Sequence, residues 1–234
     1  MTDIQILPID FYVLVACEES QRVCTEFRKL GYNAFSCDII PCSGGHPEWH
    51  IMQDVLPLIN GNCEFATMDG SGHTVSGKWD MIIAFPPCTY MSNAGACRMF
   101  PQKGEIDPER FAKAMEAKAF FMAFYNADCE RISIENPVPL KIVGLPEKSQ
   151  VIQPYQFGHP YTKKTYLWLK GLSNLISTDI VEPVGPWVCG NTKIWKKQAA
   201  KGIVYGKEKS AKERSKTFPG IAKAMAEQWG GAEK

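Results

Sequence analysis

The sequence predicts an α/β protein built on a doubly wound, mostly parallel sheet. Short apolar runs typical of buried parallel strands alternate with segments of helical spacing through the first half of the chain. With 234 residues and 45% hydrophobic content, the chain can bury one sizeable core. Polar residues such as Asp38, Cys88 and Glu135 stand at predicted strand ends, where sheets of this kind bind ligands. We therefore expect one main domain with a ligand site at that edge of the sheet.

The first strand, the first helix and the second strand follow one another closely. Phe11–Ala16 is apolar throughout, which suits a buried strand. From Glu18 to Leu30 the apolar residues recur at helical spacing, and Gly31 is a natural helix end. The second strand, Asn33–Cys37, leads to Asp38, about 20 residues beyond the first strand-to-helix turn, where an acidic side chain can hydrogen-bond a ribose.

The next elements continue the alternation. We predict a strand at Met81–Phe85, a long helix at Asp107–Ala127 and a buried strand at Arg131–Glu135. Val151–Phe157 and Lys163–Leu169 are expected to pair as two hairpin strands joined through GHPYT.

The C-terminal part contains one irregular segment and one helix. Pro183–Gly206 is rich in Gly, Pro and Trp, which predicts irregular structure. A helix is predicted from Pro219 to about Trp229, because proline suits the first helical turn and Gly230 follows the end.

Charge is unevenly distributed along the chain. Residues 1–150 contain 12 Lys+Arg against 19 Asp+Glu, whereas residues 151–234 contain 14 against 6, and the densest basic stretch is Lys193–Lys216. Trp187, Trp195 and Tyr205 lie in or beside this stretch, a mixture that suits phosphate contact and stacking on bases. A solvated, lysine-rich surface is an equally good interpretation of the charge alone.

The composition excludes several classes of protein. No run approaches the roughly 20 apolar residues of a membrane span, and the opening MTDIQILPID lacks the basic start of a secretory signal. We therefore expect a cytoplasmic protein with no membrane contact. The chain has nine cysteines, an odd number, and they lack the paired spacing of a disulfide framework. We therefore treat all nine as free thiols in a reducing compartment. No feature predicts an obligate protein partner.

Cys88 is the candidate nucleophile. It stands in IIAFPPCTYMSNAG, after an apolar stretch and two prolines. Residue type alone favours a buried, inert thiol, because reactivity requires an exposed, electropositive setting. Glu135, at the end of the predicted strand ISIENP, changes that balance, although a lone Glu there is more often a helix cap or a solvated loop residue. A thiolate that adds to carbon 6 of a pyrimidine needs an acidic group at ring nitrogen 3, and a protonated Glu135 supplies one.

Both segments resemble signatures of the DNA (cytosine-5) methyltransferases. In that family the nucleophile lies in Pro-Pro-Cys, followed at fixed spacing by Ser and then Ala-Gly, and this chain has Pro86–Cys88, Ser92 and Ala94–Gly95 in that register. The family's second signature, Glu-Asn at a strand end, is matched by Glu135–Asn136. The resemblance is best to short, phage-encoded DNA cytosine methyltransferases, and it extends over most of the chain.

The resemblance implies a Rossmann-like, S-adenosylmethionine-dependent methyltransferase fold with a small basic C-terminal appendage. Residues 1–182 would form the catalytic domain, 183–216 a short basic and aromatic DNA-binding insert that is not an independent domain, and 217–234 a helix that returns to the catalytic domain. The run KTFPGIAKAMAEQW, residues 216–229, resembles the last family motif, which completes the cofactor site.

The cofactor site implied by the resemblance is centred on two acidic residues. Asp38 matches the residue that holds the ribose of S-adenosylmethionine, and Asp54 the residue near its adenine. The family's first strand-to-helix turn is glycine-rich, whereas Ala16–Ser20 has no glycine, so the approach of the cofactor must differ in detail. Glu18 or Glu19 either meets the cofactor's ammonium group or complements the helix dipole. The residues expected around the cofactor are Ala16, Cys17, Glu18, Glu19, Ser20, Asp38, Ile39, Asp54, Phe85 and Pro86.

Target selection departs further from the family, which usually carries a separate target-recognition domain. Only about 50 residues separate Leu169 from Pro219, so Trp187–Lys216 either reads a very short site or binds mainly phosphates of double-stranded DNA. The arginines expected after the family's hairpin-region glutamine, here Gln153, are absent, and we take Lys164 as their substitute. The residues expected to contact nucleic acid are Ser92, Asn136, Lys163, Lys164, Thr165, Lys193, Lys196 and Lys197.

Alternatives to this interpretation stay open. Cys37, Cys42, His46 and His50 have the types and number of a structural zinc site, although a predicted strand position for Cys37 argues against it. An amino-methylating enzyme also uses a Pro-Pro pair but with different flanking residues. An RNA cytosine methyltransferase would use the same ring chemistry, and a non-catalytic module that binds nucleic acid or cofactor would explain the glycine-free first turn.

Overall fold

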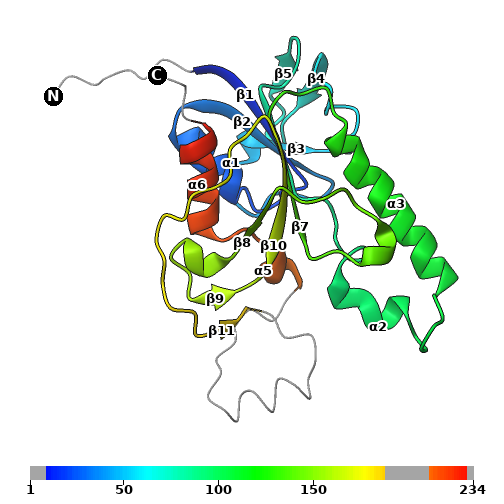
Figure 1. Ribbon diagram of the computed structural model, residues 1–234. Helices are drawn as coiled ribbons and strands as arrows, with labels where there is room; N and C mark the ends of the chain where they lie inside the picture. Colours follow the sequence, from blue (N-terminus) through cyan, green and yellow to red (C-terminus); the bar gives the residue numbers. More distant parts are fainter. Residues whose placement is uncertain (1–8, 188–210, 231–234) are drawn as a thin grey trace.

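A seven-stranded sheet forms the centre of the computed structural model, which describes residues 9–187 and 211–230 (Figure 1). The strand order is β3-β2-β1-β6-β7-β10-β8. β10 runs antiparallel to both of its neighbours, and the other strands share one direction. The strands are β1 (Ile9–Ala16), β2 (Tyr32–Asp38), β3 (His50–Met52), β6 (Met81–Ala84), β7 (Ile132–Pro137), β8 (Gln150–Ile152) and β10 (Thr165–Lys170).

The chain changes direction across this sheet between β1 and β6. From β1 it moves outward to β2 and β3, and from β6 it moves outward in the opposite sense to β7. The order β3-β2-β1-β6-β7 corresponds to that of the first five strands in dinucleotide-binding sheets. The predicted α/β class and the mostly parallel sheet are therefore confirmed, and the sheet is compatible with a Rossmann-like fold. A crevice is expected beyond the carboxyl ends of β1 and β6.

Helices cover both faces of the sheet (Figure 1). On one face, Val13 of β1 packs in a cluster with Phe27 of α1 (Arg22–Lys29) and Met225 of α6 (Pro219–Trp229). On the other face, Leu14 packs with Phe121 of α3 (Pro108–Tyr125). Successive residues of a strand point to opposite faces, so a fully apolar strand such as β1 can serve both layers.

Shorter elements surround the sheet. Two pairs of strands form small separate sheets, β4 (Cys63–Ala66) with β5 (Gly72–Val75), and β9 (Tyr161–Thr162) with β11 (Gly185–Pro186). The short helices are α2 (Ala96–Met99), α5 (Ala211–Ser215), and the 3-10 turns η1 (Pro47–Trp49), η2 (Asn93–Gly95), η3 (Lys141–Val143) and η4 (Pro154–Gln156).

Most predicted elements are present, and the largest boundary errors concern the first helix and the strand predicted from Val151. The first helix begins at Arg22 rather than at Glu18, because Gln21 has a left-handed backbone that starts the helix later. The strand predicted over Val151–Phe157 ends at Ile152, because Pro154 begins the 3-10 turn η4. β8 and β10 do pair antiparallel, as expected for the hairpin. Of the predicted irregular segment 183–206, only residues 183–187 are described.

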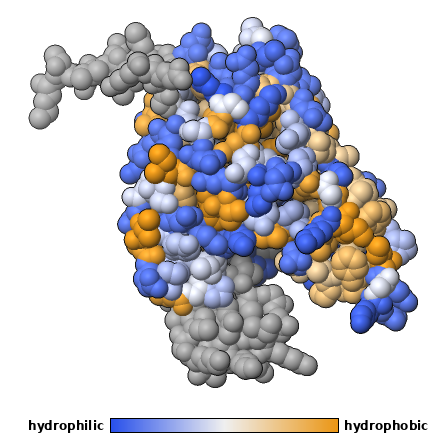
Figure 2. Space-filling model, viewed as in Figure 1, coloured by the Kyte–Doolittle hydropathy of each residue, from blue (hydrophilic) through white to orange (hydrophobic). Residues whose placement is uncertain are grey.

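Hydrophilic and hydrophobic residues are unevenly distributed over the visible face of the molecule. Figure 2 shows hydrophilic residues over much of this face, with hydrophobic residues exposed in several places, among them the right-hand side where α3 lies. Among the described helices, none is long and apolar enough to span a membrane.

Candidate active site

Two adjoining pockets lie at the carboxyl ends of the central strands. The first, which we call the Asp38 pocket, has a volume of about 530 Å³, and the second, the Cys88 pocket, has about 520 Å³. Cys17, directly after β1, and Pro87, shortly after β6, line both pockets. The pockets therefore meet at the point where the strand order reverses, as the fold predicts.

The Asp38 pocket combines carboxylates with apolar walls. Asp38 ends β2, and its Oδ1 accepts a hydrogen bond from the backbone N–H of Ile40 at 3.3 Å. Burial raises the pKa of this carboxyl group, and the backbone amides that donate to it act in the opposite direction. Asp54 follows β3 and accepts from the backbone N–H of Leu56 at 3.1 Å. Ile39, which is 76% exposed, lies between the two carboxylates in sequence and lines the same pocket.

Helix α3 supplies a wall of the Asp38 pocket that the sequence did not identify. Lys113, Glu116, Ala117 and Phe120 line the pocket and recur at helical spacing. This periodicity is visible in the sequence, but it does not reveal which pocket the helix faces. Tyr90, from the loop that follows Cys88, also lines the pocket.

The first turn adopts a glycine-type backbone without glycine. Cys17 has φ +59° and Gln21 has φ +56°, both in the left-handed region that favours glycine. The buried Gln21 amide donates to Ser36 Oγ at 3.2 Å and to the carbonyl of His46 at 2.8 Å, so tertiary hydrogen bonds hold this conformation. The turn therefore has the backbone shape that glycine would allow, but Cys17 and Gln21 adopt it with local strain.

Glu18 serves as the cap of helix α1. Its carboxylate oxygens accept hydrogen bonds from the backbone N–H groups of Val23 at 2.7 Å and Cys24 at 3.2 Å. Burial raises the pKa of Glu18 to about 7, and these two amides oppose the shift. We expected Glu18 either to meet the cofactor's ammonium group or to complement the helix dipole, and its hydrogen bonds fit the second role. Glu19 and Ser20 line the Cys88 pocket.

The loop after β6 places Cys88 in its pocket. The Cys88 carbonyl accepts from the N–H groups of Met91 at 3.1 Å and Ser92 at 2.9 Å, which closes a tight turn. Asn136 Nδ2 donates to the carbonyl of Pro86 at 3.1 Å, so the residue after Glu135 supports the loop that carries the thiol. The two segments of the predicted motif are therefore joined by a buried hydrogen bond.

Cys88 and Glu135 line the same pocket, where the charge of Glu135 acts on the thiol. Burial raises the pKa of the Cys88 thiol, the Glu135 carboxylate raises it further, and Lys163 lowers it. Burial also raises the pKa of Glu135, against the opposing charge of Lys163. The pocket thus favours the neutral forms of both groups relative to water, and Lys163 is the cation that offsets this preference.

Cations from four parts of the chain surround the Cys88 pocket. Lys163 Nζ donates to the carbonyl of Arg214 at 3.1 Å, which links the loop before β10 to helix α5. Arg22 Nη1 donates to the carbonyl of Thr217 at 2.6 Å and so holds the residues that directly follow α5. The cationic side chains that line the pocket among the described residues are Arg98, Arg110, Lys163, Arg214 and Lys216.

Several predicted site residues lie elsewhere. Ala16 is buried in β1 and lines neither pocket, although its carbonyl accepts from Phe85 N–H at 3.0 Å. Of the two lysines expected to contact nucleic acid, Lys163 lines the Cys88 pocket, whereas Lys164 is exposed and lines no described pocket. Asn136 is buried behind the pocket rather than on its wall.

The remaining predicted residues fall on several surfaces. Phe85 and Pro86, expected near the cofactor, line the Cys88 pocket together with Ser92. Thr165 is buried and lines a small cavity behind Glu135. Lys193, Lys196 and Lys197 lie outside the described residues, as do Trp195 and Tyr205.

Trp187, the described aromatic residue at the start of the basic segment, belongs to an aromatic cluster. Its ring meets the rings of Tyr161 and Phe218 edge-on, with centroids at 4.8 Å and 5.0 Å. The ring is therefore engaged within the protein, and stacking on a base at this position would require these contacts to change.

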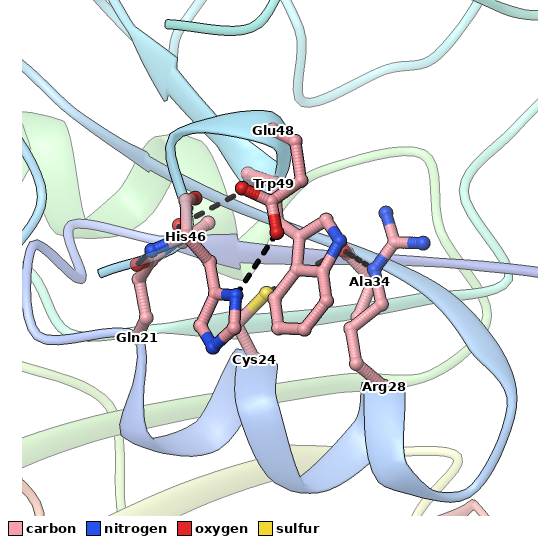
Figure 3. Close-up of polar contacts among 8 residues, drawn as sticks. Gln21, Cys24, Arg28, Ala34, His46, Glu48 and Trp49 are labelled. Carbon is pink, nitrogen blue, oxygen red and sulfur yellow. Dashed lines mark hydrogen bonds and ion pairs between the residues drawn. The ribbon is translucent and has the colours of Figure 1, made fainter. Parts of the chain in front are cut away.

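The proposed zinc ligands do not converge. His46 stacks on Trp49 with ring centroids 3.8 Å apart, and its Nδ1 pairs with Glu48 at 2.9 Å (Figure 3). His50 is buried, with Nδ1 at 2.8 Å from Ser36 Oγ and Nε2 at 3.0 Å from the Ile40 carbonyl. Across residues 9–187 and 211–230, no group of three or more His, Cys, Asp or Glu side chains could hold a metal ion.

The fold and the two pockets define the class of protein: a mostly parallel α/β protein with two adjoining pockets at its topological switch point. No protein-family model and no curated protein matches the chain. The choice of function therefore depends on the chemistry of the residues in the two pockets.

Proposed function

We propose that this protein is a DNA cytosine-5 methyltransferase that uses S-adenosylmethionine and forms a covalent bond between Cys88 and the target base. One observation carries the proposal. Cys88 and Glu135 line one pocket, and that pocket shares two wall residues with a second, carboxylate-bearing pocket. Two reacting molecules bound in the two pockets would meet at this shared wall.

The Asp38 pocket suits the proposed cofactor. Asp38 and Asp54 provide acceptors for ribose hydroxyl and adenine amino groups, and Ile39, Val55 and Phe120 provide apolar surface for the adenine ring. The volume of about 530 Å³ lies in the usual range for a small-molecule site. When bound, the cofactor supplies a methyl group on a positively charged sulfur, which carboxylate-lined walls favour.

The pair of Cys88 and Glu135 suits attack on a cytosine. The thiol first loses its proton to solvent water, and the thiolate adds to carbon 6 while protonated Glu135 gives its proton to ring nitrogen 3. Carbon 5 then holds the electron pair that takes the methyl group. After the carbon-5 proton leaves to a base, the ring double bond re-forms, the carbon–sulfur bond breaks, and Glu135 regains the proton from nitrogen 3.

The raised pKa values support this division of roles. A carboxyl group with a raised pKa keeps its proton near neutral pH more readily, as a general acid must. Protonated Glu135 also loses the negative charge that raises the pKa of Cys88, so the acid form of one group favours the thiolate form of the other. Lys163 favours the thiolate as well.

The cations around the Cys88 pocket support a nucleic acid as the second substrate. Arg98 and Arg214 are suited to phosphate, because a guanidinium can donate two parallel hydrogen bonds. Carbon 6 is unreachable inside a stacked duplex, so the base would be flipped into the pocket. Most of the affinity would then come from phosphate contacts, in agreement with the short stretch of about 50 residues between Leu169 and Pro219.

The product of the reaction tests this proposal. The protein is incubated with labelled S-adenosylmethionine and either double-stranded DNA or RNA, and the digested nucleosides are identified by mass spectrometry. We expect 5-methyl-deoxycytidine from DNA. A methyl group on the exocyclic nitrogen, transfer to RNA alone, or cofactor binding without any transfer would each contradict the proposal.

Removal of the Asp38 carboxylate should weaken cofactor binding. In the Asp38→Ala variant the ribose loses a charged acceptor, and we expect the Kd for S-adenosylmethionine to rise about 10- to 100-fold. Isothermal titration measures the effect. Asp128→Ala is a matched control, because Asp128 is exposed and pairs with Lys78 on the surface. An unchanged Kd for Asp38→Ala would place the ribose elsewhere.

A further inference from the structure

Arg110 connects helix α3 to the loop that carries Cys88. It lies in the first turn of α3, where its backbone N–H donates to the Asp107 carboxylate at 2.7 Å. Its side chain crosses to the loop, and Nη2 donates to the carbonyl of Thr89 at 2.8 Å. Thr89 directly follows Cys88. The guanidinium therefore holds the backbone next to the candidate nucleophile.

The same guanidinium lies over the ring of Tyr90, with its central carbon 5.0 Å from the ring centroid. Tyr90 lines the Asp38 pocket, whereas Arg110 lines the Cys88 pocket. Cation–π contacts of this kind are attractive and gain strength where water is excluded. Arg110 thus fixes two consecutive loop residues, Thr89 through its carbonyl and Tyr90 through its ring.

Gly95 provides the space that the guanidinium occupies. A Cβ atom built on Gly95 would lie 2.7 Å from Arg110 Nη2 and 3.4 Å from the Thr89 carbonyl oxygen. Gly95 has φ −92°, which any residue can adopt, so close approach rather than backbone conformation requires glycine here. The group in conflict is the end of a flexible side chain. A methyl group at position 95 would therefore displace the guanidinium without forcing the backbone apart.

From these contacts we infer that Arg110 is a positioning residue that fixes the loop Cys88–Gly95, and that Gly95 is glycine in order to admit it. The inference deepens the proposed function and rests on it for the identity of the reaction. The physical reason for an effect on rate is geometric: displacing a reacting group by about 1 Å can cost about 100-fold. Arg110 would act through Cys88 and would not itself contact the reacting atoms.

An opposing explanation exists for the same side chain. Arg110 Nε is buried and makes no hydrogen bond, so the guanidinium could serve instead as a phosphate ligand for DNA. The two roles affect different kinetic constants. A positioning residue acts on kcat, whereas a phosphate ligand acts on the KM for DNA and on its dependence on salt.

Three variants distinguish the roles through methyl-transfer kinetics. Arg110→Met keeps much of the side-chain volume but removes the guanidinium, and Gly95→Ala displaces it. We expect each to lower kcat by about 10- to 100-fold, with the KM for DNA changed less than about threefold. In the Arg110→Met background, Gly95→Ala should lower kcat by less than about threefold more, because the group that it displaces is already gone. Arg131→Met is the matched control, since Arg131 contacts the Phe11 ring instead.

Alkylation of Cys88 by iodoacetamide, followed by mass spectrometry of the peptide that contains it, provides a readout that needs no methyl transfer. Arg110→Met and Gly95→Ala should both change the alkylation rate of Cys88 by at least about threefold, while that of the exposed Cys97 stays constant. Folding of each variant is checked by circular dichroism. A normal kcat with a raised KM for DNA, independent effects of the two substitutions, or unchanged alkylation would overturn the inference. If the unsubstituted protein transferred no methyl group, the proposed function would be contradicted. The alkylation rates of Cys88 in the variants would still decide the role of Arg110.

Discussion

Replacing Cys88 with alanine is expected to abolish methyl transfer while leaving the protein folded and able to bind cofactor. The thiol is partly buried in the Cys88 pocket. Among the described cysteines, Cys17 also lines this pocket, but it follows β1 and does not belong to the loop after β6. Removal of an enzyme's nucleophile typically costs many orders of magnitude, so we expect kcat to fall by about 10⁴-fold or more. The measurement is transfer of a labelled methyl group to DNA under single-turnover conditions.

The matched control for this variant is Cys97→Ala. Cys97 is exposed on α2, a short distance along the chain from Cys88, and it lines neither pocket. Its removal should leave kcat within about twofold of the original value. Retention of the full rate by Cys88→Ala, with the product still methylated at carbon 5, would exclude the covalent mechanism.

The second large effect is expected for Glu135→Gln, which keeps the shape of the side chain but removes the acid. General acid catalysis contributes about 10²- to 10⁴-fold, and we expect kcat to fall within that range. Glu147→Gln, which alters an exposed residue that pairs with Lys148, is the control. A rate close to that of the original protein would show that another group protonates the base.

The same variant should also change the titration of Cys88. Because the Glu135 carboxylate raises the pKa of the thiol, its replacement by a neutral amide should lower that pKa. The thiolate would then form at lower pH, and the alkylation rate of Cys88 would begin to rise at lower pH than in the original protein. An unchanged or raised midpoint would mean that the two groups do not interact as the pocket implies.

Sequence reasoning placed the parts of the site that depend on strand ends. Asp38 ends β2, Cys88 follows β6 and Glu135 lies in the second half of β7, and parallel strands bring their carboxyl ends to one edge. An apolar run is enough to find such a strand, so the residue that follows it can be located without knowledge of tertiary structure. The C-terminal helix was equally clear, because proline and glycine mark its two ends.

The parts that were missed depend on contacts between distant segments. Lys163 and Lys164 were both expected at the site and are indistinguishable by type, and only the fold shows that Lys163 is the one that lines the pocket with Glu135. Arg110 reaches the Cys88 loop from the start of a helix, and no spacing rule links them. Short strands such as β3 and β4 contain too few apolar residues for a periodic signal.

The wrong start of helix α1 has a specific physical cause. Glu18 and Glu19 look like the acidic first turn of a helix, and Glu18 does cap α1, but it does so from a turn that precedes the helix. The left-handed residues Cys17 and Gln21 create that turn. Local propensity disfavours such a backbone for these residue types, and the hydrogen bonds of Gln21 to Ser36 and His46 override it.

A cytosine analogue tests the covalent role of Cys88 most directly. Double-stranded DNA in which 5-fluorocytosine replaces cytosine is incubated with the protein and S-adenosylmethionine, and the mixture is denatured and examined by mass spectrometry. Fluorine cannot leave carbon 5 as a proton does, so elimination of the thiolate is blocked. We expect a stable adduct that joins methylated DNA to the peptide containing Cys88, and no adduct with Cys88→Ala. Methylation of ordinary DNA without any trapped adduct, or an adduct at another residue, would contradict the mechanism.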